Sequence, residues 1–487
     1  MTTESSTPVT WPGRHVVVAG IGVSGFAAAD SLVELGAAVV VLDERDDEGA
    51  RDKARVLEVL GARVHLGPGS ASVLPDRTDL VVASPGWRPT ATLLAEAGRR
   101  DVPVWGEVEL AWRLRQPRPD GTYAPWLAVT GTNGKTTTVR MLDAMLRAAG
   151  LRSAAVGNVG TPVLEAVRHP DPYDVLAVEL SSFQLHGTHT MSPEASAVLN
   201  VAPDHVDWHG SFEAYAAAKA RIYQRTRLAC VYPLDDPRVE RMVRDADVVE
   251  GCRAIGVTAG IPPVGAMGVV DDVLADRAFV AGRDRQAAEL ASVHDVAPLA
   301  PHTLVDALTA AALARAHGVP PAAVRDGLRA FRPDAHRNAD VTPTATPVRW
   351  VDDSKATNPH AAQASLSAYD PVVWVAGGLA KGATFDGLVG AVGARLRGAV
   401  LLGRDRGVIA DALRRHAPDV PVIEVGDGET GSEVMDRVVE AASGLARPGD
   451  TVLLAPACAS MDQFRDYGVR GDAFAAAVRT RVGGAPP

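Results

Sequence analysis

The sequence is poor in cysteine, with three among its 487 residues. Cys230, Cys252 and Cys458 are scattered and form no CxxC pair, which argues against a disulfide framework and against a structural zinc site. A reducing cytoplasm is therefore the expected compartment. The sequence also lacks a basic-then-apolar leader, and no run approaches the roughly 18 apolar residues of a membrane-spanning helix. We expect neither secretion nor insertion into a membrane.

Basic residues are fewer than acidic ones: 49 Lys and Arg against 59 Asp and Glu give a net charge of −10. That balance disfavours binding to a phosphate backbone, so nucleic acid is not an expected partner. Hydrophobic residues make up 47% of the chain and charged residues 22%, values close to the globular average that exclude a disordered or fibrous protein. At about 150 residues per domain, the length suggests three domains.

Short β-branched runs alternate with helical segments along the chain, the pattern of a mostly parallel α/β sheet. The segments 113–125 and 331–337, rich in proline and polar residues, are typical of connections between domains. We therefore predict an α/β fold of three domains, each a doubly wound and mostly parallel sheet, over residues 1–118, 119–333 and 334–487. Strands are expected near residues 16–20, 37–43, 80–84, 126–130, 175–180, 348–352, 371–376, 398–402 and 451–455.

The first glycine motif follows the strand expected near residue 16. Gly20, Gly22 and Gly25 fit GxGxxG, and Asp43 ends the next expected strand. Such a turn brings backbone N–H groups and a helix N-terminus onto a phosphate, with the acid placed for a ribose hydroxyl. The pattern specifies a diphosphate better than it specifies nicotinamide. A redox dinucleotide, another diphosphate and simple strand–helix packing all stay open at this point.

The second glycine motif, residues 130–136, reads TGTNGKT between an apolar strand and a long helical pattern. Lys135 can neutralise the β- and γ-phosphates of a nucleotide, and the Thr136 hydroxyl can bind Mg²⁺. The common Walker A spacing would need glycine at Val129, so the loop departs from that pattern. ATP is nevertheless the expected ligand. Glu179 ends a later strand, where a carboxylate is placed to bind the magnesium of the nucleotide.

The last third of the chain places Lys, Thr and Ser side chains after expected strands, in segments around Asp353, Lys381 and Ser460. Convergent donors of this kind would suit a small dicarboxylate, because carboxylate oxygens removed from water need several donors. Local turn hydrogen bonding is an equally good explanation of each segment taken alone. His205 and Lys219 gain no chemistry from sequence context, and no metal other than Mg²⁺ is indicated.

With these motifs, the chain resembles the Mur ligase family of peptidoglycan synthesis over essentially its whole length. TGTNGKTT at residues 130–137 marks the superfamily, which also contains folylpolyglutamate synthetase. DDSKATNP at 352–359 and PACASMDQF at 456–464 are similar to the branch that adds D-glutamate. The resemblance implies a cytoplasmic, monomeric ligase that uses ATP to join D-glutamate to UDP-N-acetylmuramoyl-L-alanine through an acyl phosphate. Because an acyl phosphate hydrolyses in water, the C-terminal domain is expected to swing closed.

The resemblance also implies roles for individual residues, and it reassigns the first glycine turn from nicotinamide to UDP. Lys219 matches a lysine that reacts with CO₂ to form a carbamate, an anion able to bind a second Mg²⁺. The residues expected around UDP are Val23, Ser24, Asp43, Arg45 and Gly86, with Asn158 facing the substrate. Those expected around ATP are Gly131, Thr132, Asn133, Gly134, Lys135, Thr136 and Thr137, joined by Arg337 and Asp353. The expected catalytic residues are Lys135, Glu179, His205 and Lys219, and the expected metal ligands are Thr136, Glu179, His205 and Lys219. Those expected around glutamate are Lys355, Thr357, Lys381, Ser460 and Tyr467.

The chain departs from the family pattern at two places. His302-Thr303 and Asp306 stand where His-Asn and a second Asn are expected, which weakens the expectation of adenine contacts from that helix. Tyr467 stands where phenylalanine is usual and can still pack against the glutamate side chain. The rival functions are a NAD-dependent dehydrogenase, a regulatory nucleotide-binding protein without catalysis, and a ligase like folylpolyglutamate synthetase. The sequence leaves the choice between D- and L-glutamate undecided.

Overall fold

The structure is a computed structural model that describes residues 10–341, 347–426 and 431–482. Two compact units make up the chain. One contains the residues up to Asp295 together with Val305–Ala330, and the other contains Val296–Leu304 together with the residues from Phe331 onward. Helices flank mostly parallel sheets in both units, so the predicted α/β fold is confirmed. The domain limits at residues 118 and 333 stay predictions.

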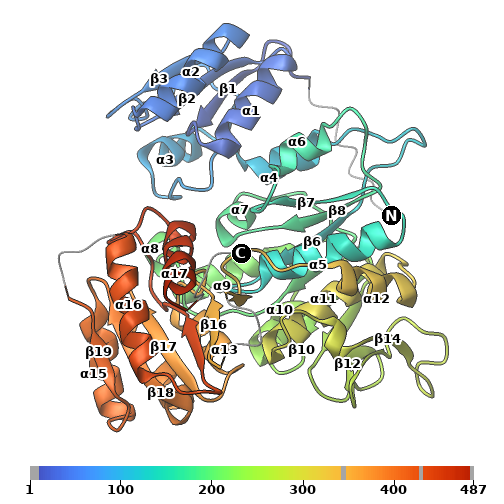
Figure 1. Ribbon diagram of the computed structural model, residues 1–487. Helices are drawn as coiled ribbons and strands as arrows, with labels where there is room; N and C mark the ends of the chain where they lie inside the picture. The colour runs from blue at the N-terminus through green and yellow to red at the C-terminus, as the bar shows by residue number, and fades with distance from the viewer. Residues whose placement is uncertain (1–9, 342–346, 427–430, 483–487) are drawn as a thin grey trace. The chain divides into compact units, whose positions relative to one another are not determined.

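The first sheet has the strand order β3-β2-β1-β4-β5 and is entirely parallel. The order reverses between β1 and β4, and in such sheets ligands bind at that point, beyond the carboxyl ends of the strands. Helices pack beside this sheet (Figure 1). The elements are β1 (His15–Ala19), α1 (Val23–Glu34), β2 (Ala38–Asp43), α2 (Glu48–Leu60), β3 (Arg63–Leu66), β4 (Leu80–Ala83), α3 (Thr92–Arg99), β5 (Val104–Gly106) and α4 (Glu107–Arg113).

The central sheet has the order β14-β13-β12-β11-β10-β9-β6-β8-β7. It is parallel from β7 to β12, whereas β12, β13 and β14 run antiparallel, an extension that the sequence did not predict. The strands are β6 (Trp126–Thr130), β7 (Ser153–Gly157), β8 (Val175–Glu179), β9 (Ala195–Val198), β10 (Ala229–Pro233), β11 (Arg253–Val257), β12 (Ala266–Val270), β13 (Val273–Asp276) and β14 (Ala288–Ser292). The helices are α5 (Lys135–Ala148), α6 (Val163–Val167), α7 (Ser182–His186), α8 (Val206–His209), α9 (Phe212–Ala220), α10 (Pro237–Arg244), α11 (Pro301–Ala316) and α12 (Pro321–Ala330).

The first and central sheets share one hydrophobic core. Val16 of β1, Val108 of α4 and Trp126 of β6 belong to the same cluster of buried residues. Backbone bonding continues across the joint, where Gly106 N donates to Gly187 O at 3.0 Å. The two glycine turns, which the sequence predicts to bind phosphate, therefore lie in one packed unit.

The third sheet has the order β15-β16-β20-β17-β18-β19, with only β15 antiparallel to its neighbour. Alternate residues of its strands fill two cores: Trp374 lies in one, and Val373 and Val375 lie in the other. Helices cover both faces of the sheet (Figure 1), because residues on both faces are apolar. The elements are β15 (Ala339–Asp340), β16 (Arg349–Asp352), α13 (Pro359–Leu366), β17 (Val372–Gly377), α14 (Asp386–Val392), β18 (Leu396–Leu402), α15 (Arg406–His416), β19 (Val422–Glu424), α16 (Ser432–Leu445), β20 (Thr451–Leu454) and α17 (Tyr467–Val482).

In the described part of the chain, none of the helices combines the length and the apolar character that crossing a membrane requires.

Candidate functional site

The first glycine turn joins β1 to α1 and uses its glycines for different purposes. Gly20 adopts a φ of +98°, and a Cβ there would lie 2.9 Å from Ser84 Oγ. A Cβ on Gly25 would overlap the carbonyl oxygen of Gly20, so only glycine lets α1 approach the strand this closely. Gly22 faces open space, with an Arg45 nitrogen 4.0 Å from the position of a Cβ. The turn therefore leaves room for a ligand at the start of α1.

A cavity of about 700 Å³ lies beside this turn, at the carboxyl ends of β1, β2 and β4. All five residues that the resemblance implies for UDP line it, although they come from three separate segments of the sequence. They are Val23, Ser24, Asp43, Arg45 and Gly86.

Asp43 anchors one wall of this cavity. Its carboxylate accepts hydrogen bonds from the backbone N–H of Ile21 at 2.7 Å and from Arg45, whose N–H lies at 2.9 Å and Nη2 at 3.0 Å. Burial disfavours the charged form, but the hydrogen bonds from Arg45 and Ile21 outweigh it and lower the pKa of Asp43. The carboxylate is thus ionised, and it holds the glycine turn and the Arg45 guanidinium in place.

The central loop at residues 131–134 joins β6 to α5. Asn200 binds its backbone, and Asp306 lies against Gly134. Asn200 Oδ1 accepts hydrogen bonds from the N–H groups of Thr132 at 3.1 Å and Asn133 at 3.0 Å. Gly134 has a φ of +85°, and a Cβ there would collide with the Asp306 carboxylate. Sequence reasoning did not find Asn200, because an asparagine after a strand has no distinctive pattern.

Two lysines converge on one carbonyl oxygen of this loop. Lys135 Nζ donates to Gly131 O at 2.8 Å and to Thr132 O at 2.9 Å, and Lys219 Nζ donates to Gly131 O at 2.7 Å. The Lys219 side chain is 2% exposed and lies 4.8 Å from the centre of the Tyr215 ring. Burial, reinforced by the nearby Lys135 charge, lowers the pKa of Lys219 well below its usual range. This shift favours the neutral amine, the form in which a lysine can act as a nucleophile.

Glu179, at the end of β8, is buried and held at both oxygens. Thr136 Oγ1 donates to one oxygen at 2.8 Å, and Asn158 Nδ2 donates to the other at 2.8 Å. The Thr136 hydroxyl at the start of α5 and the Glu179 carboxylate beside it are oxygen ligands of the kind that Mg²⁺ prefers. Among the described residues, no three histidine, cysteine or acidic side chains gather as a metal site, so the remaining ligands would come from phosphate, water or a modified lysine.

His205 lies close enough to Lys219 and Lys135 to feel their charges, but its contacts are with other side chains. Its backbone is left-handed, with a φ of 52°, and its ring packs against Phe183 with centroids 4.7 Å apart. Nε2 lies 3.7 Å from Asp204. Burial, followed by the Lys219 and Lys135 charges, lowers the pKa of His205 although Asp204 opposes the shift. The neutral imidazole is therefore the favoured form, as a metal ligand requires.

The residues that depart from the family pattern on α11 are buried. Thr303 is 2% exposed, and burial together with His360 lowers the pKa of His302 to about 4. Asp306 lies against the loop at Gly134, as described above. An acid therefore stands beside the phosphate-type loop at this position.

In the third sheet, the residues expected around glutamate lie on segments that the fold joins. Leu379 and Ala459 exchange backbone hydrogen bonds of 2.8 and 3.0 Å, which brings the segment of Lys381 beside the segment of Ser460. Lys355 Nζ lies 4.0 Å from the centre of the Tyr467 ring. The Thr357 N–H donates to Lys355 O at 2.8 Å.

Asp353 and Arg337, expected to reach ATP, differ in burial. Asp353 accepts hydrogen bonds from Asn338 N at 3.3 Å and from the Ser365 hydroxyl, and its burial raises its pKa to about 6. Arg337 is half-buried, with Nε 3.9 Å from Asp334.

Sequence reasoning missed Arg470 of α17, which is 1% exposed. Its guanidinium donates to Ser354 Oγ at 3.0 Å, to Ser354 O at 2.9 Å and to Cys458 O at 3.1 Å. It therefore ties the segments of Lys355 and Ser460 to α17. Burial lowers the pKa of Arg470 to about 10, so the group stays charged at neutral pH. Its partners lie on segments distant in the sequence, so nothing in the sequence distinguished this arginine from an ordinary helix residue.

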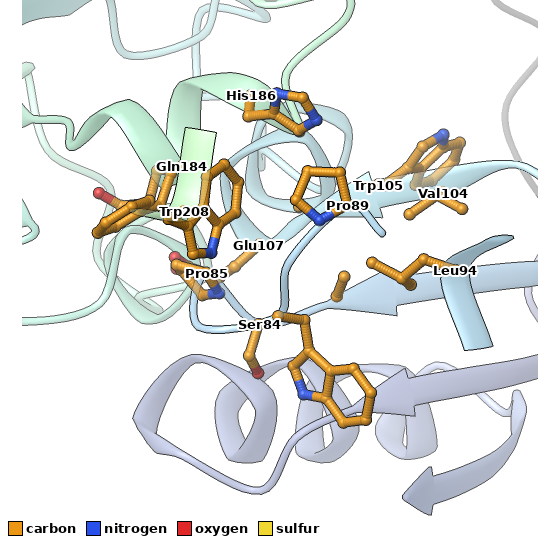
Figure 2. A pocket seen from close by; sticks show the side chains of 15 residues that line it. Ser84, Pro85, Pro89, Leu94, Val104, Trp105, Glu107, Gln184, His186 and Trp208 are labelled. Carbon is orange, nitrogen blue, oxygen red and sulfur yellow. The ribbon is translucent and has the colours of Figure 1, made fainter. Parts of the chain in front are cut away.

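A second, smaller pocket of about 200 Å³ adjoins the first turn, and Ser84, Pro85 and Trp87 line both cavities. Figure 2 shows aromatic and proline side chains around it, with Glu107 among them. Burial raises the pKa of Glu107 to about 7, against the hydrogen bonds from Leu164 N–H and Gln184. This carboxyl group lies at the joint between the first and central sheets.

Comparisons with known proteins agree along the chain. The Mur ligase MurD-like N-terminal domain matches residues 14–106, the Mur ligase middle domain matches 129–258, and the Mur ligase glutamate ligase domain matches 337–458. The UDP-N-acetylmuramoylalanine--D-glutamate ligase of Streptomyces coelicolor is 60% identical over 472 residues, covering 97% of this chain and 99% of that protein.

Solved structures share the fold at lower identity. The UDP-N-acetylmuramate-alanine ligase MurC from Thermotoga maritima has a TM-score of 0.55 at 19% identity, covering 96% of this chain and 99% of that one. The MurF ligase from Thermotoga maritima in complex with ADP has a TM-score of 0.54 at 17% identity, covering 96% of each chain. With three matching domains in order and 60% identity to a ligase over nearly the full length, the chain belongs to the Mur ligase family.

Proposed function

We propose that the chain is an ATP-dependent ligase of peptidoglycan synthesis that joins D-glutamate to UDP-N-acetylmuramoyl-L-alanine and forms ADP and phosphate. The observation that carries the proposal is the 60% identity, over 97% of the chain, to a relative named for that reaction. The cavity beside the first glycine turn and the lysine-lined central loop support it. They are two separate places for two phosphate-bearing molecules.

The acceptor substrate binds at the first sheet. Its UDP part lies against Val23, Ser24 and Gly86, and the Arg45 guanidinium, oriented by Asp43, neutralises phosphate charge. Asn158 faces this substrate, and its side chain donates a hydrogen bond to Glu179.

ATP binds at the central loop, where the amides of residues 131–134 and the start of α5 face its phosphates. Lys135 leaves its own loop carbonyls and pairs with the phosphate oxygens. Thr137 lies in the first turn of α5, and Arg337 and Asp353 complete the nucleotide contacts.

The reaction begins with activation of the L-alanine carboxylate, because a carboxylate is unreactive toward amines. Its oxygen attacks the γ-phosphorus of ATP, the bond to the β-γ bridging oxygen breaks, and ADP leaves. Lys135 stabilises the charge that develops on the transferred phosphoryl group. The amine of glutamate then attacks the acyl carbon, phosphate departs, and an amide remains.

Mg²⁺ fits the hydroxyl and carboxylate of Thr136 and Glu179 and supplies charge neutralisation to the phosphates. Thr136, Glu179 and His205 would hold this magnesium, and a carbamylated Lys219 would hold a second one. The low pKa of Lys219 favours that modification, because only the neutral amine attacks CO₂. Bicarbonate labelled with ¹³C should give a carbamate signal that Lys219→Arg lacks, and a signal unchanged in that variant would refute the assignment.

Glutamate binds at the third sheet, where Lys355 and Lys381 pair with its carboxylates and Thr357 and Ser460 donate hydrogen bonds. Tyr467 packs against its aliphatic carbons. We further propose domain limits at residues 118 and 333, a movement of the C-terminal domain during turnover, and a monomer that works in the cytoplasm.

The test is phosphate release by the purified chain with ATP and magnesium chloride. Release should require UDP-N-acetylmuramoyl-L-alanine and D-glutamate together, and L-glutamate should replace D-glutamate poorly. Release that needs neither substrate, or that proceeds with a folate in place of the UDP-sugar, would refute the proposal.

A further inference from the structure

Two of the three cysteines, 22 residues apart in the sequence, meet in the central sheet. Cys230 lies in β10 and Cys252 directly precedes β11, the strand that pairs with β10. Their Sγ atoms are 3.8 Å apart. β9 separates β10 from β6, which leads into the central loop.

Geometry places both side chains on one face of the sheet. In the parallel pair β10–β11, Cys230 lies beside Ala254, and Cys252 precedes Ala254 by two residues. Cys252 packs against the same hydrophobic cluster that contains Cys230, and the 3.8 Å between the sulfurs places both on one side of the sheet. Closing the 3.8 Å gap to a bond of about 2.05 Å would move each sulfur by roughly 1 Å.

The two thiols differ in a way that suits a sequential reaction. Cys252 is partly exposed, whereas Cys230 is 2% exposed. The hydrogen bond between the thiols lowers the pKa of Cys252 and raises that of Cys230, which burial raises further. The accessible thiol is thus the better thiolate, and the buried one is held next to it.

We propose that Cys230 and Cys252 form a reversible disulfide when the protein meets hydrogen peroxide. The Cys252 thiolate attacks one peroxide oxygen, the O–O bond breaks, and a sulfenic acid and water form once a proton is taken up. The Cys230 sulfur then attacks the Cys252 sulfur, the S–O bond breaks, and a second water leaves. Two thiols are oxidised by two electrons, and one peroxide is reduced to two waters. In a reducing compartment the dithiol is the resting form.

Cys458 provides an internal contrast. It is also buried, and burial raises its pKa to about 12. Its contacts differ from those of the other two cysteines, because its backbone carbonyl accepts a hydrogen bond from Arg470 of α17. A thiol buried without a neighbouring thiol is expected to stay reduced under the same treatment.

The experiment treats the folded full-length protein with hydrogen peroxide, blocks free thiols with N-ethylmaleimide under denaturing conditions, and counts them by mass spectrometry. The count should fall from three to one, with a tryptic peptide that links the segments of residues 230 and 252. Dithiothreitol should restore all three thiols. Cys458→Ser should still lose two thiols, whereas Cys230→Ser and Cys252→Ser should form no intramolecular link.

Thermal unfolding provides an independent measurement. The disulfide closes the loop 230–252 and restrains the unfolded chain, so it should raise the Tm by about 5 °C, reversibly. Three free thiols after peroxide treatment, sulfinic acid at Cys252 without a link, or dimers linked through Cys252 would overturn the proposal.

Discussion

The two glycine turns of the first unit follow the same plan, a strand, a turn and a helix, yet their charges are arranged in opposite ways. At the first turn an ionised carboxylate, Asp43, accepts from the turn's own backbone and orients one arginine. At the second turn two lysines, Lys135 and Lys219, donate to the carbonyl of Gly131. This difference agrees with the proposed roles, in which the first turn holds a diphosphate and the second brings Lys135 onto the phosphate that reacts.

The glycines also differ between the turns. Gly25 is required by the packing of α1 on Gly20, whereas Gly134 is required by its left-handed backbone and by the Asp306 carboxylate beside it. A GxGxxG pattern and a GKT pattern therefore restrict the backbone for separate physical reasons. Substitutions at the two turns should affect different measurable properties.

The largest effect is expected from Lys135→Ala. Removing the cation from the reacting phosphate should lower phosphate release by about 1,000-fold or more, while binding of the UDP-linked substrate to the first turn stays within about threefold. Stopped assays of phosphate release and calorimetric titration with the UDP-sugar measure the two quantities. Arg140→Ala, an exposed position of the same helix, is the matched control and should retain activity. If the rate of phosphate release by Lys135→Ala stays within tenfold of wild type, the proposed difference between the two turns is wrong.

Gly25→Ala should destabilise the first unit by about 3 kcal/mol, because the methyl group overlaps the Gly20 carbonyl and the helix has to move. Gly22→Ala is the matched control in the same turn, since Gly22 has a φ of −61° and open space. Its effect should stay below about 1 kcal/mol. Urea unfolding followed by tryptophan fluorescence compares the two variants. Equal destabilisation would show that the close approach of α1 does not depend on Gly25.

The third prediction concerns Glu107, at the joint between the first and central sheets, and the dependence of the free energy of unfolding on pH. Its pKa is raised from 4.5 to about 7, so between these values the folded state holds a proton that the unfolded state has lost. The stability that this proton supplies is present in full below pH 4.5 and is lost as the pH rises through 7, to a total of roughly 3 kcal/mol. Glu107→Gln should flatten this part of the stability curve between pH 5 and 8.

The control for that curve is Glu58→Gln at an exposed position of α2. It should keep the wild-type pH dependence in urea unfolding. If Glu107→Gln has the same slope as wild type, the carboxyl group is ionised in the folded protein throughout this range.

The smallest effect is expected from Asp43→Asn. The amide keeps an oxygen for Ile21 N–H but loses the charged pair with Arg45, so the KM for the UDP-linked substrate should rise about tenfold. The KM for ATP should not change. Both KM values are measured in the same phosphate-release assay. A rise in both would show that the two turns are not independent.

Much of the fold could be predicted from the sequence because its strands are short β-branched runs with both faces buried. The run at 126–130 is the clearest case, since β6 is Trp126–Thr130 as predicted. The antiparallel strands β12 to β14 were missed, because short segments such as Ala266–Val270 carry neither a hairpin signature nor a motif.

The candidate site could be predicted only where a motif or the family resemblance marked it. Lys135 and Thr136 follow from their spacing, whereas Lys219 reads as a surface residue until the fold buries it beside Gly131. Arg470 and Asn200 could not be found, because their partners are backbone atoms that only the folded chain brings near. The roles of all predicted site residues stay predictions until such variants are measured.

The shared carbonyl of Gly131 has a consequence for how a nucleotide enters. Before it arrives, the Lys135 ammonium group and the Lys219 nitrogen already donate to a protein carbonyl, so neither group is buried without a partner. Association is then an exchange of one set of contacts for another, and its free energy is a small difference between them. A ligand with several anionic oxygens offers more acceptors to replace these contacts than a monoanion does, so the resting loop favours a polyphosphate over a simple anion.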